Sequence, residues 1–264
     1  MFTKEMLTAQ LRQMGIRPDD TVLIHTSLKA VGQVEGGADG LIDVFREYLS
    51  QGLFLVPTHT WATVNRDNPY FDVRSAVPCI GTLPRVAVQR TDGVRSLHPT
   101  HSMKAWGREA EDFVRGEEDA GSPGAPGHCW DKLADRHAKI LLIGVNHGKD
   151  TFIHSVDERA GLPDRVSTES FQVTITDRGG NRMVRPLRWH QCSRTPDVSQ
   201  FYVNFEKPLL ELGAQTFGQL GNAEVRVVDA AKAQQIILRI YSRAKSDIFT
   251  EIHELPEELY RDGV

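Results

Sequence analysis

The chain has 264 residues, of which 40% are hydrophobic and 25% charged, so it can bury a substantial core as a globular protein. A net charge of −4 without a dominant basic stretch excludes nucleic acid as the main partner. No apolar run approaches the ~20 residues that span a bilayer, and the three cysteines are too widely spaced to suggest a disulfide framework or a thiolate zinc site.

Short apolar strands alternate with helical patterns along the chain, which predicts an α/β fold. Residues 1–15 have an amphipathic helix pattern without the apolar stretch of a secretory signal, so we expect a cytoplasmic protein. In chain order we then expect a strand at 21–25, a helix at 37–50, a strand at 52–57 and a helix at 81–90. Pro84 fits the last of these helices because it falls in the first turn.

The same alternation continues in the second half of the chain. The patterns predict short helices at 108–116 and 129–136, a buried strand at 139–145, a hairpin over 171–187, a helix at 199–213, and a strand that runs into a closing helix over 224–245. The hairpin turns at Gly179 and Gly180, and we expect the helix at 199–213 to kink or break at Pro208. The sequence shows no internal repeat or linker, which favours a single domain over 1–264.

Polar clusters follow three of the expected strands. They read "HTSLKAVG" from His25, "THTWATVN" from Thr58 and "NHGKDTFIH" from Asn146. Because ligands of open α/β sheets bind outside the carboxyl ends of the strands, we expect the three clusters to form one site. For His25, His59 and His147 the alternative is that each is an ordinary loop histidine.

Several common catalytic motifs are missing from the sequence. It contains no GxSxG, no GxxxxGK[ST] and no GxGxxG, so a nucleophile elbow, a P-loop and a dinucleotide fingerprint are unsupported. A metal-dependent hydrolase stays an alternative, and its ligands would be His98, His101, His154 and Asp157. Against it, there is no HExxH motif, and Pro99 favours a turn over a helix at His98.

The segment "DTFIHSVDER" carries titratable groups that suit general-base catalysis. If it opens a helix with Asp150 or Thr151 as the N-cap, then His154, Asp157 and Glu158 share one face. A histidine titrates near neutral pH, and a neighbouring carboxylate can fix its tautomer and stabilise the imidazolium. Such a pair suits the deprotonation of an amine or hydroxyl that attacks an activated acyl group. The alternative is an ordinary charged cluster on a helix surface.

Four longer motifs occur in a recognisable order and spacing. They are "HTSLKAVG" (25–32), "VPTHTWATVN" (56–65), "VRSLHPTHSMKAWG" (94–107) and "KILLIGVNHGKDTFIHSVDERAGLP" (139–163). Together they resemble the aminoglycoside 3-N-acetyltransferase superfamily, the acetyl-CoA-dependent antibiotic acetyltransferases, over nearly the whole chain. The resemblance implies a three-layer α/β/α sandwich of that type with the hairpin as an addition. It also implies acetyl-CoA as the cosubstrate, with no metal.

The resemblance further implies roles for individual residues. His154 falls on the histidine of the family's "NTxxH" segment and would be the general base, with Asp157 and Glu158 as its acidic partners. The "HTSL" loop and the "RSLHPTHS" segment would bind acetyl-CoA through His25, Thr26, Ser27, Leu28, Arg95, Ser96, His98 and His101. A hydroxyl and backbone N–H groups that enter a helix suit a pyrophosphate, and an arginine suits a phosphate. The implied mechanism is direct transfer, in which the acceptor nitrogen attacks the thioester without an acetylated enzyme.

The acceptor is expected to be an amine, from an aminoglycoside or another amino-bearing small molecule. The resistance enzymes resemble one another in an acidic stretch that faces the sugar amines, but the corresponding region here, "RGGNRMVRPLRWHQCSRTP", has no acidic residue. It has five arginines, namely Arg178, Arg182, Arg185, Arg188 and Arg194. Because a basic lining attracts anions, we hypothesise an acceptor with an anionic group and weak acetylation of aminoglycosides. The alternative is that these arginines only face solvent.

The residues expected on the acceptor side are Thr58, His59, Asn65, Asp67, His147, Asp150 and His190. Besides the small-molecule acceptor, a second copy of the chain in a homodimer is the default partner.

Overall fold

The computed structural model describes residues 1–244, 248–249 and 251–262, and a central sheet organises them. In this described part the sheet has seven strands in the order β4-β5-β2-β1-β6-β10-β9. They are β1 (Thr21–Thr26), β2 (Leu53–Pro57), β4 (Val94–Arg95), β5 (Met103–Gly107), β6 (Lys139–Ile143), β9 (Gln215–Leu220) and β10 (Ala223–Asp229). The strands predicted at 21–25, 52–57 and 139–145 are thereby confirmed.

Strand β1 lies in the middle of the sheet and pairs in parallel with both β2 and β6. Val22 lies opposite Phe54 on one side, and Ile24 lies opposite Leu141 on the other. On the outer sides, β5 and β10 join in the antiparallel direction. The carboxyl ends of three parallel strands therefore meet at one edge of the sheet, as the sequence predicts.

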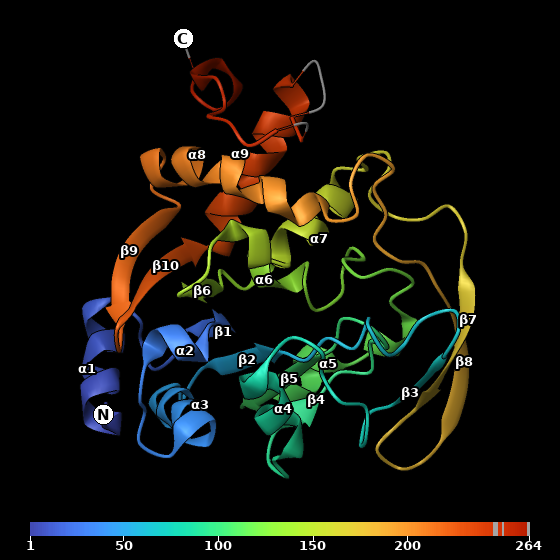
Figure 1. Cartoon of the computed structure of the whole chain (residues 1–264), viewed down its shortest axis with the longest axis horizontal. Helices are drawn as coiled ribbons and strands as arrows, with labels where there is room; N and C mark the ends of the chain where they lie inside the picture. The colour runs from blue at the N-terminus through green and yellow to red at the C-terminus, as the bar shows by residue number, and fades with distance from the viewer. Residues whose placement is uncertain (245–247, 250, 263–264) are drawn as a thin grey trace.

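Helices cover both faces of the sheet (Figure 1). One face packs against α1 (Lys4–Gln13), α2 (Leu28–Val31), α3 (Gly37–Tyr48) and α4 (Thr82–Gln89). The other packs against α5 (Ala110–Val114), α6 (Lys132–Asp135), α7 (Phe152–Arg159), α8 (Glu206–Glu211) and α9 (Ala230–Arg243). Short 3₁₀ helices are η1 (Glu117–Asp119), η2 (His147–Lys149), η3 (Val198–Phe205) and η4 (Glu257–Leu259). This is the three-layer α/β/α sandwich that the resemblance implies.

Strand β6 shows why its sequence is an unbroken apolar run. Ile140 and Leu142 point into the core beneath α5 to α9, whereas Leu141 and Ile143 point into the core beneath α1 to α4. All four side chains are fully buried. A strand covered on both faces cannot alternate apolar and polar residues, and so it reads as a continuous hydrophobic segment.

The predicted hairpin is confirmed as β7 (Phe171–Thr176) and β8 (Arg182–Leu187), which pair antiparallel. A third strand, β3 (Tyr70–Asp72), pairs in parallel with β7 and was not expected, because a three-residue strand leaves almost no pattern. Phe71, Val173 and Ile175 form a small core on this sheet, which lies apart from the central one (Figure 1).

The prediction of one helix at 199–213 is partly wrong. The segment is the 3₁₀ helix η3 followed by α8, which begins at Glu206. Pro208 lies in the first turn of α8 and does not end a helix, because a proline there removes no hydrogen bond within the helix. The closing helix α9 is confirmed to Arg243, and its last expected residue, Lys245, lies outside the described residues.

Within the part of the chain that the structure describes, no helix has both the length and the apolar character that a membrane crossing requires. Cys79, Cys129 and Cys192 are free thiols. The division into one domain over 1–264 stays a prediction.

Gly144 lies directly after β6, where the loops that follow β1 and β6 approach each other. Its φ is 65°, in the left-handed region that favours glycine. A Cβ at this position would lie 2.4 Å from the Cβ of Ala30 and 3.4 Å from the Cβ of Ser27. Only glycine therefore lets the two loops pack at this distance.

We predict that Gly144→Ala lowers the free energy of unfolding by about 3 kcal/mol, from the left-handed backbone together with the overpacked Cβ. Gly161 is a matched control, since its φ is also 65° but nothing lies within 4 Å of its Cβ position. Gly161→Ala should cost only the backbone contribution of about 1–2 kcal/mol. Denaturant unfolding measures both, and equal losses would contradict a role for the close packing at Gly144.

Candidate active site

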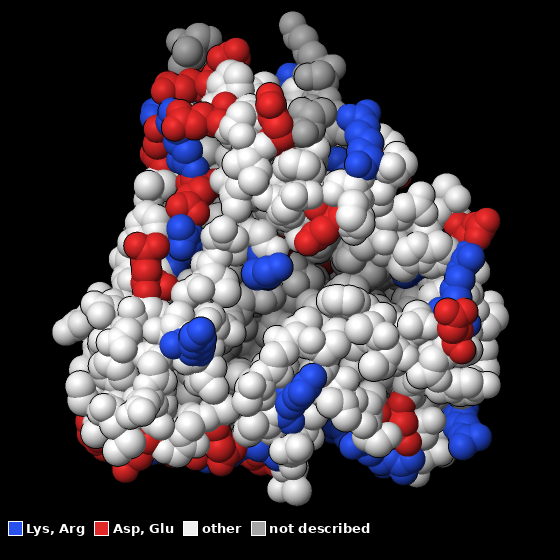
Figure 2. All heavy atoms as spheres, in the orientation of Figure 1, with Lys and Arg blue, Asp and Glu red and all other residues white. Residues whose placement is uncertain are grey.

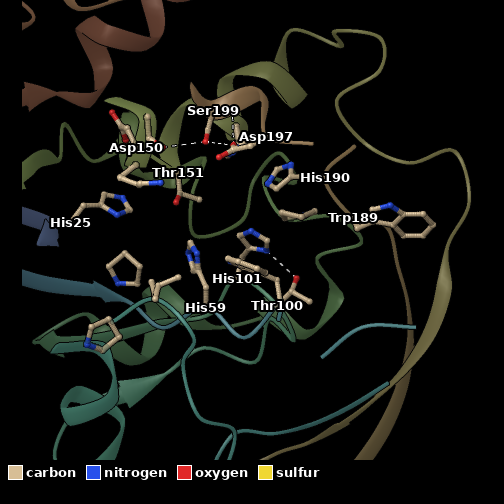
Figure 3. A pocket seen from close by; sticks show the side chains of 18 of the residues that line it. His25, His59, Thr100, His101, Asp150, Thr151, Trp189, His190, Asp197 and Ser199 are labelled. Atoms are coloured by element: carbon tan, nitrogen blue, oxygen red, sulfur yellow. Dashed lines mark hydrogen bonds between the residues drawn. The ribbon is translucent and has the colours of Figure 1, made fainter. Parts of the chain in front are cut away.

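A cavity of about 880 Å³ opens at the edge of the sheet where β1, β2 and β6 end. The loops after these strands form one part of its wall, and segments 189–192 and 196–199 form another. Figure 2 shows acidic and basic side chains interspersed on the viewed face, without a large patch of one sign. Inside the cavity, histidine side chains from several segments converge (Figure 3).

Four histidine rings lie in contact along the cavity wall. His154 stacks on His190 with ring centroids 3.8 Å apart, and His190 meets His101 edge-on at 5.0 Å. His101 in turn lies 4.6 Å from His59. Burial lowers the pKa of His59, His101 and His190 well below the ordinary value, so these rings are neutral near pH 7.

His154 is held by a tyrosine that the sequence did not single out. The Tyr202 hydroxyl, from η3, lies 2.8 Å from Nδ1 of His154 and donates to Oδ2 of Asp157 at 2.5 Å. Since this hydroxyl has one proton and gives it to the carboxylate, Nδ1–H of His154 must donate to the tyrosine oxygen. The lone pair of the neutral ring then lies on Nε2, the nitrogen that is free to act in the cavity.

Asp157 lies at the inner end of this relay and is fully buried. Its Oδ1 accepts a hydrogen bond from the Tyr241 hydroxyl, and Nε of Arg165 lies 3.8 Å from its Oδ2. Burial raises the pKa of Asp157 to about 7, although the two tyrosines and Arg165 partly oppose that shift. Burial, with smaller contributions from His59 and Arg165, lowers the pKa of His154 to about 3. The ring of His154 is therefore an uncharged imidazole at neutral pH.

Glu158 was expected beside His154, and this expectation is wrong. Its carboxylate accepts hydrogen bonds from the backbone N–H of Gly124 at 2.6 Å and from the Ser122 hydroxyl. Positions 157 and 158 point about 100° apart on the helix, and here Asp157 turns toward Tyr202 of η3 while Glu158 turns toward the loop at Gly124. Glu158 instead fastens the loop that contains Pro123, a residue of the cavity wall.

The structure brings ten of the predicted site residues to the cavity wall. They are His25, Thr26, Ser27, His59, Asn65, Asp67, His101, Asp150, His154 and His190. Besides Asp157 and Glu158, six predicted residues do not line it, namely Leu28, Thr58, Arg95, Ser96, His98 and His147.

Arg95 was expected to meet a phosphate, but its guanidinium is enclosed. It is 4% exposed and donates to the carbonyl oxygens of Ala76 at 2.6 Å and Thr58 at 3.0 Å. Its Nε also lies 3.2 Å from both the Thr58 and Ser102 hydroxyls. With its donors committed to protein oxygens, Arg95 supports the wall from behind, and Thr58 is one of its buried acceptors.

His98 and Ser96 also hold the wall from behind. Nδ1 of His98 accepts from the backbone N–H groups of Thr100 and His101, and its Nε2 lies 3.1 Å from the carbonyl oxygen of Ser122. The Ser96 hydroxyl accepts from the backbone N–H of Met103 at 3.0 Å. These bonds shape the turn that presents His101. Leu28, the first residue of α2, packs into the core on the α1 to α4 face.

His147 is fully buried rather than open to an acceptor. Its Nε2 lies 2.6 Å from Oε1 of Gln215, and its Nδ1 lies 3.2 Å from Oδ2 of Asp150. The ring therefore ties the loop after β6 to β9. Of the two histidines in "HGKDTFIH", only His154 reaches the cavity.

The hydrolase alternative would need His98, His101, His154 and Asp157 around one metal ion. Both ring nitrogens of His98 already contact backbone groups, and Asp157 accepts two tyrosine hydroxyls. Among the residues described, no group of three or more His, Cys, Asp or Glu side chains is placed to hold a metal ion. The four expected ligands are thus not brought together.

The arginine-rich hairpin does not form the basic lining that the sequence suggested. None of the five arginines in and directly after the hairpin lies among the described residues of the cavity wall. Arg178 pairs with Glu111 at 3.0 Å, and Arg185 pairs with Asp119 at 2.6 Å. These pairs connect the hairpin to α5 and η1, and the five arginines therefore do not supply the basic cavity lining on which an anionic acceptor was hypothesised.

Sequence reasoning missed Tyr202 and Tyr241, since neither lies near His154 in the chain. Tyr202 falls in the mostly apolar segment "QFYVNF", where an aromatic residue is ordinarily core. It also missed Trp130, whose indole N–H donates to the carbonyl oxygen of His101 at 3.0 Å. No local pattern marks such residues, because their roles depend on tertiary packing.

Comparison with known proteins gives a consistent family assignment. The family model of aminoglycoside 3-N-acetyltransferase matches residues 23–242. An aminoglycoside N(3)-acetyltransferase III of Serratia marcescens is 30% identical over 262 residues, covering 90% of this chain and 95% of the relative. An aminoglycoside N(3)-acetyltransferase VIII of Streptomyces fradiae is 25% identical, covering 87% and 88%.

Solved structures agree on the fold. Aminoglycoside acetyltransferase AAC(3)-Xa has a TM-score of 0.75 at 26% identity, covering 89% of this chain and 90% of that chain. AAC-VIa bound to sisomicin has a TM-score of 0.76 at 23% identity, covering 93% and 99%. AAC-IIIb in a binary complex with CoASH has a TM-score of 0.75 at 22% identity, covering 89% and 94%. The resemblance expected from the four motifs is confirmed: the chain belongs to the aminoglycoside 3-N-acetyltransferase family and is an acyltransferase.

Proposed function

We propose that this chain transfers the acetyl group of acetyl-CoA to an amino group of an aminoglycoside. The observation that carries the proposal is the relay from His154 through Tyr202 to Asp157, which leaves Nε2 of His154 available in the cavity. A volume of about 880 Å³ is near the upper end for small-molecule sites, as two substrates require. The family and the relatives named above support both substrates.

His154 acts as the general base in this proposal. As the acceptor nitrogen attacks the thioester carbonyl carbon, Nε2 takes the proton that the nitrogen loses. Nδ1–H continues to donate to Tyr202, and the ionised Asp157 at the end of the relay stabilises the imidazolium that forms. The proton then returns to the CoA sulfur as the carbon–sulfur bond breaks. No side chain becomes acetylated.

The charged side chains of the cavity wall favour binding of a cationic acceptor over an anionic one. Its charged residues are Arg66, Asp67, Lys149, Asp150 and Asp197. Arg66 is already paired with Glu169 at 2.5 Å and stacks on Trp189 with its guanidinium carbon 4.2 Å from a ring centroid. Among the described residues of the wall, three carboxylates thus outnumber the one basic side chain that is not in an ion pair, Lys149, although Asp150 is buried and contacts His147. Carboxylates attract the ammonium groups of an aminoglycoside.

On the donor side, the "HTSL" loop stays our assignment for part of the acetyl-CoA site. His25, Thr26 and Ser27 line the cavity, and the Ser27 hydroxyl accepts from the backbone N–H of Ala30 at the start of α2. With Arg95 enclosed, we assign to Lys149 the cation that meets a phosphate of acetyl-CoA.

We predict that His154→Ala lowers acetyl transfer to sisomicin by roughly 10³-fold, the usual contribution of a general base. Thiol release from acetyl-CoA measures the rate, and mass spectrometry should find one acetyl group on the acceptor and none on the enzyme. The variant should keep its thermal shift with CoASH, which serves as the control for folding. Turnover close to wild type would remove His154 from the mechanism, and no turnover of sisomicin by the wild type would overturn the acceptor.

We predict that the pH dependence of kcat follows the ionisation of Asp157. Below its pKa of about 7, Asp157 is protonated and can itself donate to the Tyr202 oxygen, so the tyrosine can donate to Nδ1 of His154 and leave the imidazole proton on Nε2. The kcat should therefore rise as pH passes through about 7 and level off above it. This rise is the acidic limb of the pH profile of kcat. Because the pKa of His154 is about 3, the titration of that ring does not produce the limb.

Asp157→Asn should remove the limb near pH 7 and leave a low rate that varies little with pH. Glu158→Gln, which changes the neighbouring carboxylate, should keep the limb in place even if the rate falls. A limb near pH 7 that survives in Asp157→Asn would assign the titration to another group.

Tyr202→Phe tests the link between base and carboxylate. We expect kcat to fall by about 10–100-fold, the value of a hydrogen bond to a charged group, with KM for both substrates nearly unchanged. Tyr241→Phe is the matched control, since Tyr241 donates to the same carboxylate from α9. It should lower kcat less. Equal losses in the two variants would mean that support of Asp157, not contact with His154, is what matters.

A further inference from the structure

Thr151 occupies the N-cap position of α7 but does not cap the helix. A capping residue usually has extended backbone geometry and a side-chain oxygen that accepts from a backbone N–H of the first turn. Thr151 instead has helical angles, φ −61° and ψ −22°, and its side chain makes no capping hydrogen bond. Its hydroxyl is thus not used to stabilise the helix.

This hydroxyl points into the cavity. Thr151 is one of the lining residues, and Figure 3 shows its oxygen directed into the space bordered by His25, His59 and His190. Thr151 lies three residues before His154, and residues at this spacing are neighbours on one helix face, with Cβ atoms about 5–6 Å apart. A hydroxyl and an imidazole at this spacing can contact the same small group in the cavity.

We propose that Thr151 is a catalytic residue whose hydroxyl donates a hydrogen bond to the carbonyl oxygen of the thioester during acetyl transfer. The proposal rests on the function proposed above and assigns its oxyanion donor. The acceptor nitrogen and the carbonyl oxygen are bonded to the same carbon in the tetrahedral state. A base that meets the nitrogen therefore requires a donor for the oxygen close by, and Thr151 lies on the same face one turn earlier.

The nitrogen lone pair forms the C–N bond, the carbonyl π electrons move to oxygen, and that oxygen accepts the Thr151 hydrogen bond. Nε2 of His154 takes the N–H proton. When the C=O bond reforms, the C–S bond breaks, its electron pair leaves on the CoA sulfur, and the sulfur receives the proton from His154. The products are the N-acetylated acceptor and CoASH.

Two polar groups close to Thr151 fit the role less well. Asp150 is a carboxylate when ionised, so it accepts hydrogen bonds and would repel a developing oxyanion. Nδ1 of His101 is already engaged with the Thr100 hydroxyl at 3.0 Å. The hydroxyl of Thr151 is a neutral donor at the N-terminal end of α7, where the helix dipole also favours negative charge.

Thr151→Val keeps the shape of the side chain and removes the donor, whereas Thr151→Ser keeps the donor and removes the methyl group. We expect Thr151→Val to lower kcat by about 10²–10³-fold, as the loss of one oxyanion donor does elsewhere, and Thr151→Ser to retain most of the rate. KM for both substrates and the melting temperature should change little, because the hydroxyl caps no backbone group. Thr151→Ala, which cannot overpack, is the second variant without the donor.

Rates are measured by thiol release with sisomicin and, in parallel, with a panel of simple amines, so that the comparison does not depend on the aminoglycoside. Wild-type turnover of any amine with a large kcat loss in both Thr151→Val and Thr151→Ala, restored in Thr151→Ser, supports the proposal. A kcat within about twofold of wild type in Thr151→Val overturns it, as does a loss that falls entirely on KM. Failure with sisomicin alone would count against the proposed acceptor and not against Thr151.

Discussion

The hydroxyl of Tyr202 carries one proton and contacts two groups, His154 and the carboxylate of Asp157. Because the carboxylate takes that proton, the imidazole must direct its own proton to the tyrosine and keep its lone pair on the opposite nitrogen. An ionised carboxylate in the core would be costly without donors, and here Tyr202, Tyr241 and Arg165 compensate its charge. The tautomer of His154 is thus set by the charge of one buried carboxylate.

The relay is also part of the core that holds the sandwich together. Tyr202 contacts Phe205 and Phe249 with ring centroids 6.3 and 5.8 Å apart, and Tyr241 contacts the same two rings at 5.8 and 6.0 Å. The guanidinium of Arg165 lies over Phe249, 4.7 Å from its ring centroid. Elements from α7, η3, α9 and the segment after α9 therefore meet around one carboxylate. The same side chains therefore stabilise the fold and orient His154.

The sequence predicted those features that local pattern encodes, and missed those that depend on distant contacts. The strands beneath the site were predictable because burial on both faces leaves a continuous apolar run, and His154 was predictable from its helix face and its motif. Tyr202 lies 48 residues from His154, and Glu111 lies 67 residues from its partner Arg178, so no periodicity relates them. Arg95 has the chemistry of a phosphate ligand, but only the folded chain shows that protein carbonyls enclose it.

Helix α7 sets the spacing of three polar side chains at the site. Thr151, His154 and Asp157 recur every three residues, so a hydroxyl, an imidazole and a carboxylate follow one another along neighbouring turns. Glu158, one residue further round the helix, holds the loop at Gly124, where an added Cβ would lie 2.7 Å from the backbone of α7. That close packing fixes the rotation of the helix from its outer side. The proposed chemistry then draws on the tyrosine of η3, with Tyr241 and Arg165 in support of Asp157, and recognition of the acceptor is left to the loops of the cavity wall.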